Sequence, residues 1–213
     1  MDMGADELQQ HLASAPDAVD ALFERPYAYP LPSREVADLV VEHYLSRGGK
    51  KPSPAKIITL AGYARDVRTA KHVIERHLPS RLVLMKKHGF NSYHAAAISG
   101  DLKLLGKAAD RGHDVRAVTG DFTSLFRLAE PLLLAIKFSN YAVADAIIEA
   151  SPEAKTAFRT LQSLIRDGDD DGLEYLVAKG IDFSELSQHG RFVEPPDVAT
   201  IDFLLAHGWD LSF

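Results

Sequence analysis

The sequence of 213 residues contains no cysteine. This absence excludes disulfides, thiolate zinc sites, iron–sulfur clusters and cysteine nucleophiles, and it fits a reducing compartment. Long apolar runs are also missing, because the longest, residues 131–136, is far shorter than the roughly 20 residues that span a bilayer. The acidic and polar residues 1–7 do not read as a signal peptide. We therefore expect a cytoplasmic or nuclear protein without a membrane span, and secretion by an unconventional route stays open.

Catalytic signatures are scarce. The chain has no P-loop, no nucleophile elbow, no dinucleotide fingerprint and no H-E-x-x-H zinc motif. Ser53 and Lys56 fit the spacing S-x-x-K, but the companion motifs are missing and a helix cap explains Ser53. His72 and His77 are five residues apart, which does not place them on one helix face. We expect a non-enzymatic protein with no catalytic residues, no metal site and no cofactor.

The segment 167–172 has the pattern D-x-D-x-D-G that opens an EF-hand calcium loop. That loop needs a bidentate carboxylate at its twelfth position, where this chain has Ala178, and an apolar eighth residue, where it has Glu174. Carboxylates also favour the N-terminus of a helix. We therefore predict a turn that caps a helix and no calcium site.

Apolar residues make up 46% of the chain and recur mostly at the i, i+3, i+4 spacing of amphipathic helices, which predicts an all-α protein. One or two helices are expected within residues 5–24. Ser33 is expected to cap the next helix, Ser53 with Pro54 to open another, and residues 68–78 to form a fourth. Beyond these, helices of about ten residues are expected in pairs, with longer loops at two places, residues 116–124 and 184–196.

Charge is unevenly distributed along a chain whose formal net charge is −6. Eleven basic and two acidic residues lie in segment 47–87, whereas eleven acidic and two basic residues lie in segment 167–213. Such asymmetry can steer charged partners, although solvated faces explain it equally well. The basic segment contains one aromatic residue, Tyr63, which disfavours base stacking and leaves a phosphate backbone or an acidic protein as its ligand.

Acidic or amide residues recur in the predicted turns at a mean spacing of about 33 residues. They are Asp66, Asp101, Asn140, Asp169 and Asp197. Three of the units also close with glycine, one residue and aspartate, at Gly112, Gly180 and Gly208. Glycine adopts the left-handed conformation that ends a helix without a steric penalty, so these positions are predicted helix ends.

The unit of residues 89–115 resembles the ankyrin repeat, which is about 33 residues long and carries the signature T-P-L-H-x-A. Residues 91–94, Asn-Ser-Tyr-His, stand where the family has T-P-L-H, so Asn91 and Ser92 depart from the usual Thr-Pro. The resemblance implies a solenoid of antiparallel helix pairs and a His94 ring that hydrogen-bonds the loop backbone. We expect an irregular helical cap over residues 1–32 and an ankyrin-like array over residues 33–213, in which 89–213 match better than 33–88.

The resemblance also implies a protein-interaction module that binds a partner through the concave face and loop tips of the array. The register predicts six partner-binding residues: Phe90, Asn91, Arg116, Lys137, Phe138 and Arg166. Two aromatic residues of the long loop, Phe122 and Phe126, are expected to pack against the array. Two alternatives remain: an anionic-partner or nucleic-acid binder through segment 47–87, and a ubiquitin-ligase adaptor, because residues 31–46 resemble the opening of an F-box.

Overall fold

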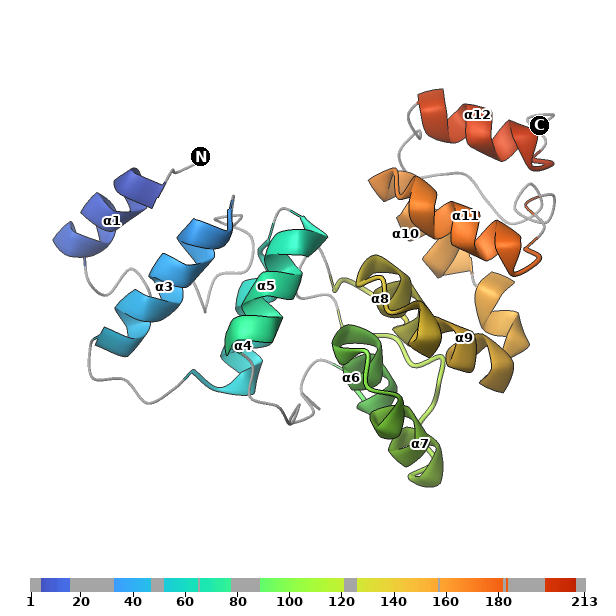
Figure 1. The fold of residues 1–213 in the computed structure, drawn as a ribbon, viewed down its shortest axis with the longest axis horizontal. Helices are drawn as coiled ribbons and strands as arrows, with labels where there is room; N and C mark the ends of the chain where they lie inside the picture. The colour runs from blue at the N-terminus through green and yellow to red at the C-terminus, as the bar shows by residue number, and fades with distance from the viewer. Residues whose placement is uncertain are drawn as a thin grey trace. The chain divides into compact units, whose positions relative to one another are not determined.

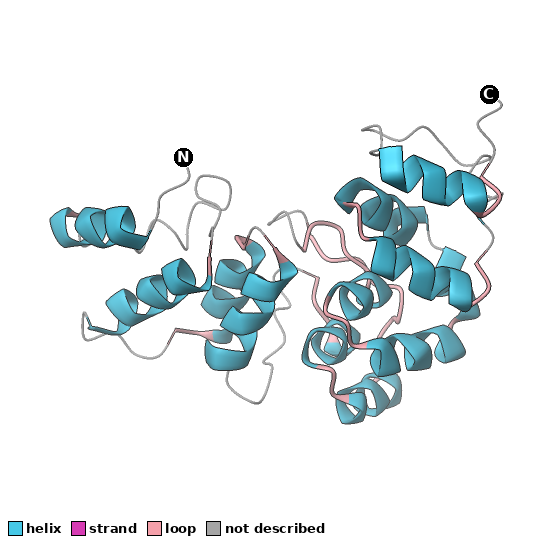
Figure 2. Ribbon diagram, turned by 45° about the horizontal axis from the view of Figure 1, so that its top comes forward, coloured by secondary structure: helices cyan, strands magenta, loops and turns pink. Residues whose placement is uncertain are grey.

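The computed structural model describes residues 5–15, 33–46, 52–64, 66–77, 89–120, 126–156, 158–181, 183 and 198–209. Within these ranges the chain forms helices and no β-strand, which confirms the predicted all-α class (Figures 1 and 2). None of the described helices combines the length and the apolar character needed to cross a membrane.

The chain divides into two compact units. The first comprises Met1–Gly89 and Thr119–Arg127, and the second comprises Phe90–Val118 and Leu128–Phe213. The first unit thus holds the predicted cap and the weakly matching residues 33–88, and the second holds the better-matching residues 89–213 except Gly89 and Thr119–Arg127.

Four helices form the described part of the first unit: α1 (Ala5–Ser14), α3 (Arg34–Ser46), α4 (Pro54–Gly62) and α5 (Val67–His77). α3 packs against α1 and α5, and α4 packs against α5. Two of the predicted caps are confirmed, because the Ser33 hydroxyl accepts from the Val36 amide at 3.3 Å and the Ser53 hydroxyl accepts from the Lys56 amide at 3.3 Å. Asp66 caps α5 by accepting from the Thr69 amide at 2.8 Å.

The second unit contains the remaining helices: α6 (Ser92–Ser99), α7 (Leu102–Asp110), α8 (Pro131–Lys137), α9 (Tyr141–Ala150), the 3₁₀ helix η2 (Pro152–Thr156), α10 (Phe158–Asp167), α11 (Asp170–Ala178) and α12 (Val198–Ala206). Helices α6 and α7, α8 and α9, and α10 and α11 form consecutive pairs (Figure 1). Packing between pairs involves mainly their first helices, since α8 contacts both α6 and α10.

The same backbone chemistry joins the two helices of every pair. A residue in the left-handed region follows the first helix of each pair, with φ of 72° at Gly100, 55° at Ser139 and 61° at Gly168. The next residue is the N-cap of the second helix: Asp101, Asn140 or Asp169. The recurring turn residues of the sequence are therefore helix N-caps in all three described pairs.

Three helices, α7, α11 and α12, end in a common way, whereas α9 ends at Ser151 with φ of −149°. Gly112, Gly180 and Gly208 have φ of 64°, 77° and 91°, which confirms the predicted left-handed helix ends. After each glycine, the next backbone amide donates to a carbonyl five residues earlier, at 2.9–3.1 Å. This is the Schellman pattern, which satisfies carbonyls that the end of a helix would leave unpaired.

The core of the second unit consists largely of the first helices of the pairs. All seven residues of α8 are buried, and so are seven of the eight residues of α6. The second helices bury one stripe only; α7 buries Ala108 and α9 buries Val143, Ala144 and Ile147. The exposed side chains of each pair therefore lie mainly on its second helix.

Several sequence predictions lie outside the described residues. They are the second half of the predicted cap (residues 16–32), the loop of residues 184–196, Phe122 and Asp197. Much of the basic segment is also outside, including residues 47–51 and 78–87.

Candidate functional site

Two of the six predicted contact residues are core residues. Phe138 is 1% exposed and Phe90 is 8% exposed. The Phe90 ring lies 5.4 Å from the His94 ring, between centroids. A position that the predicted register places on the contact surface is not always exposed, because an apolar ring can fold back onto the core. We therefore remove Phe90 and Phe138 from the candidate contact surface.

Lys137 is also buried, with a side chain that is 4% exposed. Its ammonium forms an ion pair with the Asp167 carboxylate, and Arg166 Nε donates to the other oxygen of the same carboxylate at 2.9 Å. Burial raises the pKa of Asp167, but the charge and the hydrogen bond of Lys137 outweigh it, so that this pKa lies below its usual value. Lys137 thus joins α8 to α10, and it presents no surface to a partner. Arg166 remains partly exposed.

Asn91 has a structural role as the N-cap of α6. Its side-chain oxygen accepts from the Tyr93 and His94 amides at 2.9 and 3.2 Å, and His94 Nδ1 accepts from the Asn91 amide at 3.1 Å. His94 Nε2 lies 3.3 Å from the Ala129 carbonyl oxygen. The expected hydrogen bond between this ring and the loop backbone is therefore present. Burial lowers the pKa of His94 to about 4, so the ring is neutral near pH 7.

Arg116 is exposed, and its backbone amide donates to the Asp114 carboxylate at 2.8 Å. Further along the same loop Phe126 is completely buried, which confirms that it packs inside the fold. Of the six predicted contact residues, only Arg116 and Arg166 therefore keep a charged side chain that a partner can reach.

A buried carboxylate that the sequence did not indicate lies at the start of α8. Glu130 is 6% exposed, and Thr160 Oγ1 donates to it at 3.4 Å. Burial raises the pKa of Glu130, and the nearby positive charges of Arg116 and Arg159 offset only part of this effect. An acidic residue before a proline reads as an exposed helix start, so the sequence carries no sign of its burial.

An aromatic cluster lies on the outer surface of α9 and α11. The Tyr141 and Tyr175 rings stack with centroids 4.8 Å apart and planes at 29°. Tyr175 donates its hydroxyl proton to Asp145 at 2.6 Å, and Lys179 Nζ pairs with the same carboxylate at 2.6 Å. We call these four residues the tyrosine face. Burial and the hydrogen bond to Asp145 raise the pKa of the Tyr175 hydroxyl, so it stays protonated in physiological solution.

The helices that carry the tyrosine face are acidic on their exposed side. Five carboxylates are exposed there: Asp145, Glu149, Asp170, Asp171 and Glu174. Neither α9 nor α11 contains a basic residue, and Lys179 follows directly after α11. The sequence showed the acidity of this region, but it did not show that two tyrosines 34 positions apart lie face to face.

Asp38 of α3 binds two histidines of α5, His72 and His77. The Nε2 atoms of His72 and His77 lie 3.1 and 2.9 Å from Asp38 Oδ1, and Arg76 donates to Oδ2 at 2.5 Å. Burial raises the pKa of Asp38, but these hydrogen bonds and charges lower it below its usual value. The five-residue spacing of the two histidines on α5 still allows a shared partner, because Asp38 lies on the neighbouring helix α3. Among the described residues no group of three or more histidine or carboxylate side chains has an arrangement suited to a metal ion.

The basic segment uses part of its charge within the first unit. Besides Arg76, Lys56 places its ammonium 4.5 Å from the centre of the Tyr44 ring and 3.1 Å from the Tyr44 hydroxyl.

Asp169 in the acidic motif caps α11 by accepting from the Gly172 amide at 3.1 Å, as predicted for a capping turn.

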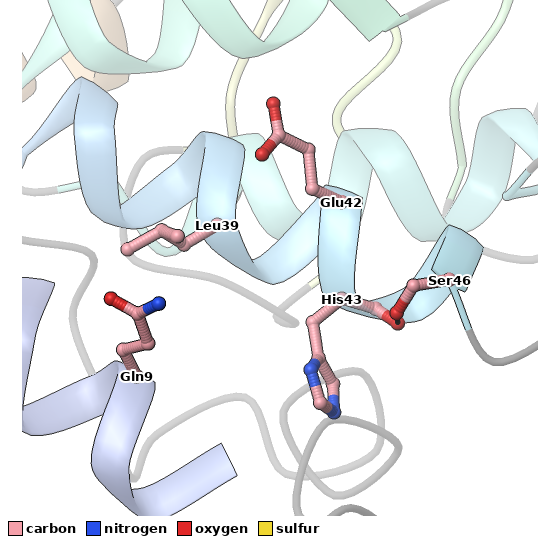
Figure 3. Close-up of a pocket in the computed structure, with 5 residues that line it drawn as sticks. All are labelled: Gln9, Leu39, Glu42, His43 and Ser46. Carbon is pink, nitrogen blue, oxygen red and sulfur yellow. Dashed lines mark hydrogen bonds between the residues drawn. The ribbon is translucent and has the colours of Figure 1, made fainter. Parts of the chain in front are cut away.

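A pocket of about 210 Å³ lies beside α1 and α3 in the first unit. Figure 3 shows Gln9 from α1 and Leu39, Glu42, His43 and Ser46 from α3 around it. Its volume is below the roughly 300 Å³ at which ligand pockets usually begin. The pocket therefore does not define a small-molecule site.

No family model, curated protein or solved structure matches this chain. We therefore infer its function from the geometry of the chain itself.

Proposed function

We propose that this protein is a non-enzymatic protein-interaction module built from ankyrin-like helix pairs. The observation that carries the proposal is the recurrence of one pair design, in which a left-handed link and an N-cap join two short helices three times in succession. Arrays of this kind bury each pair against the next and leave a long surface that can vary without disturbing the core.

Because the first helices are largely buried, we place the contact surface on the second helices and the loop tips. Since α8 has no exposed residue, a partner finds little to contact there. Arg116 in a loop and Arg166 in the last turn of α10, next to the turn that leads into α11, are the predicted contact residues that keep exposed charged side chains, and we assign them to the interaction surface. Because the chain has no cysteine, we place the interaction in a reducing compartment, the cytoplasm or the nucleus.

Affinity capture from a cell lysate with the purified full chain tests this proposal. The double variant Arg116→Glu, Arg166→Glu reverses charge on the assigned surface, and Arg68→Glu reverses an exposed charge on α5 of the first unit. We expect a protein that is retained at low and high salt by the original chain and by Arg68→Glu, and that is lost from the double variant. Thermal unfolding of each variant verifies that it is folded.

The opposite pattern would contradict the proposal. Nucleic acid retained only at low salt, and lost on Arg68→Glu, would assign the function to the basic segment, because phosphate contacts weaken steeply with salt. Capture of a ubiquitin-ligase subunit through residues 31–46 would instead support the adaptor alternative.

A further inference from the structure

We propose that the tyrosine face binds an arginine-bearing segment of a partner protein. This inference rests on the proposed function and names the chemistry of one contact. The starting observation is the Tyr141 ring, which is 36% exposed and lies flat against Tyr175 on the outside of two neighbouring second helices.

The tyrosine face is held in place before any partner arrives. Tyr175 is fixed by its hydrogen bond to Asp145, and the Lys179 ammonium lies 5.4 Å from the centre of the Tyr175 ring. Lys155 Nζ in turn donates to the Lys179 carbonyl at 3.1 Å. A surface that is already ordered loses little conformational entropy on binding, and rigid tyrosines with polar neighbours are typical of binding hot spots.

The charge around the rings selects a basic partner. The exposed sides of both helices carry carboxylates, of which Asp145 bonds Tyr175 directly. The nearby basic residues are already engaged, since Lys179 pairs with Asp145 and Lys155 donates to the Lys179 carbonyl. An acidic surface repels the phosphates of nucleic acids and membranes, so a basic segment of a protein is the complementary ligand.

Arginine fits this surface better than lysine does. A guanidinium is planar, so it can stack on the exposed face of Tyr141 while its N–H groups, which lie in its own plane, stay free to donate two parallel hydrogen bonds to a carboxylate. The position of Lys179 near the Tyr175 ring shows that this face already accommodates a cation. Arginine is therefore the side chain that can use both the aromatic and the acidic part of the surface.

Fluorescence anisotropy with a short peptide of alternating arginine and glycine tests the inference on the full chain. The matched probes replace arginine with lysine or with glutamate, at physiological ionic strength. We expect the arginine peptide to bind most tightly and Tyr141→Ala to weaken that binding by about fivefold, the size of one cation–π contact. Tyr141→Phe, which keeps the ring, retains the affinity.

Two further variants separate the aromatic from the acidic contribution. The double variant Glu149→Gln, Glu174→Gln removes two charges from the exposed sides of α9 and α11, and we expect it to weaken binding of the arginine peptide as well. Leu102→Ala truncates an exposed apolar side chain on α7, which is 50% exposed, and we expect no change. Circular dichroism of every variant verifies its helix content.

Several results would overturn the inference. Equal affinity for the arginine and lysine peptides, or equal binding by Tyr141→Ala, would show that net charge alone acts there. A dimer that dissociates on Tyr141→Ala would assign the face to a second copy of this chain. If a captured partner needs Arg116 and Arg166 but tolerates Tyr141→Ala, this inference fails while the proposed function stands.

Discussion

At the scale of single residues, the fold of the second unit depends on glycines at positions of close approach. A Cβ atom on Gly172 would lie 2.8 Å from Ile136 Cγ2 and 3.0 Å from the Asp169 carboxylate, so α8 and α11 need glycine where they meet. Gly106, in α7, has no atom within 4 Å of the corresponding position. The same substitution should therefore act in opposite directions at these two sites.

We predict that Gly172→Ala lowers the free energy of unfolding by about 1–3 kcal/mol, because overpacking exceeds the gain in helix propensity. Gly106→Ala should raise it by about 0.5–1 kcal/mol, since alanine favours an exposed helix. Urea unfolding of both variants measures the difference. Equal shifts of the two midpoints would contradict the close contact between α8 and α11.

The left-handed glycines give a second residue-scale prediction. Alanine at Gly112, Gly180 or Gly208 should each cost about 1 kcal/mol of stability, because φ lies between 64° and 91° there. Gly112 is the cleanest site, since no atom lies within 4 Å of a Cβ and only the backbone conformation matters. Unchanged unfolding midpoints for all three variants would contradict the helix-end assignment.

The buried histidine gives a pH prediction. The pKa of His94 is lowered from 6.5 to about 4 in the folded protein, so the unfolded chain binds a proton first as the pH falls. The contribution of His94 to the free energy of unfolding is then complete above pH 6.5, and it decreases by roughly 3 kcal/mol as the pH falls to about 4. Urea unfolding over this range, with His94→Gln as control, measures it. An equally steep pH dependence in His94→Gln would show that other groups cause the effect.

At the scale of helices, the sequence predicted where most elements begin and end. Ser33, Ser53 and the left-handed glycines act locally through the backbone, so their residue type alone indicates their structure. The packing of side chains across helices could not be read in this way. Phe138 looked like a contact residue, and Tyr141 was not noticed, because exposure depends on neighbours that are distant in the sequence.

Asn140 occupies the N-cap position of α9, and its side chain joins two helix pairs. Its side-chain amide does not cap α9; it donates to the Ala97 and Ile98 carbonyls at the end of α6, at 2.7 and 3.1 Å. Asparagine is therefore required as a donor, a role that aspartate cannot fill although it is an equally good generic N-cap.

We predict that Asn140→Asp lowers stability by about 1–3 kcal/mol, because two carbonyls lose their donor and face a negative charge. Asp101→Asn is the matched control at the preceding link, where the side chain accepts from Lys103 and asparagine serves equally well. Thermal unfolding of both variants compares them. An unchanged unfolding temperature for Asn140→Asp would contradict a stabilising role of its two hydrogen bonds to the end of α6.

At the scale of the whole molecule, charge is divided between the two units. The basic segment 47–87 belongs entirely to the first unit, and the acidic segment 167–213 belongs to the second. The sequence showed this asymmetry, but it did not show that the basic side chains Lys56 and Arg76 have partners within their own unit. An interaction surface on the second unit therefore agrees best with both the charge and the exposed side chains.

Hydrogen–deuterium exchange of the chain with and without its captured protein partner tests the central claim most directly. We predict new protection on the second helices and loop tips of the second unit, above all in α9, α11 and the residues around Arg116. Amides of α8 should change little, because they are already buried in the core. Protection confined to α3–α5 of the first unit, or none anywhere, would contradict an interaction surface on the helix pairs.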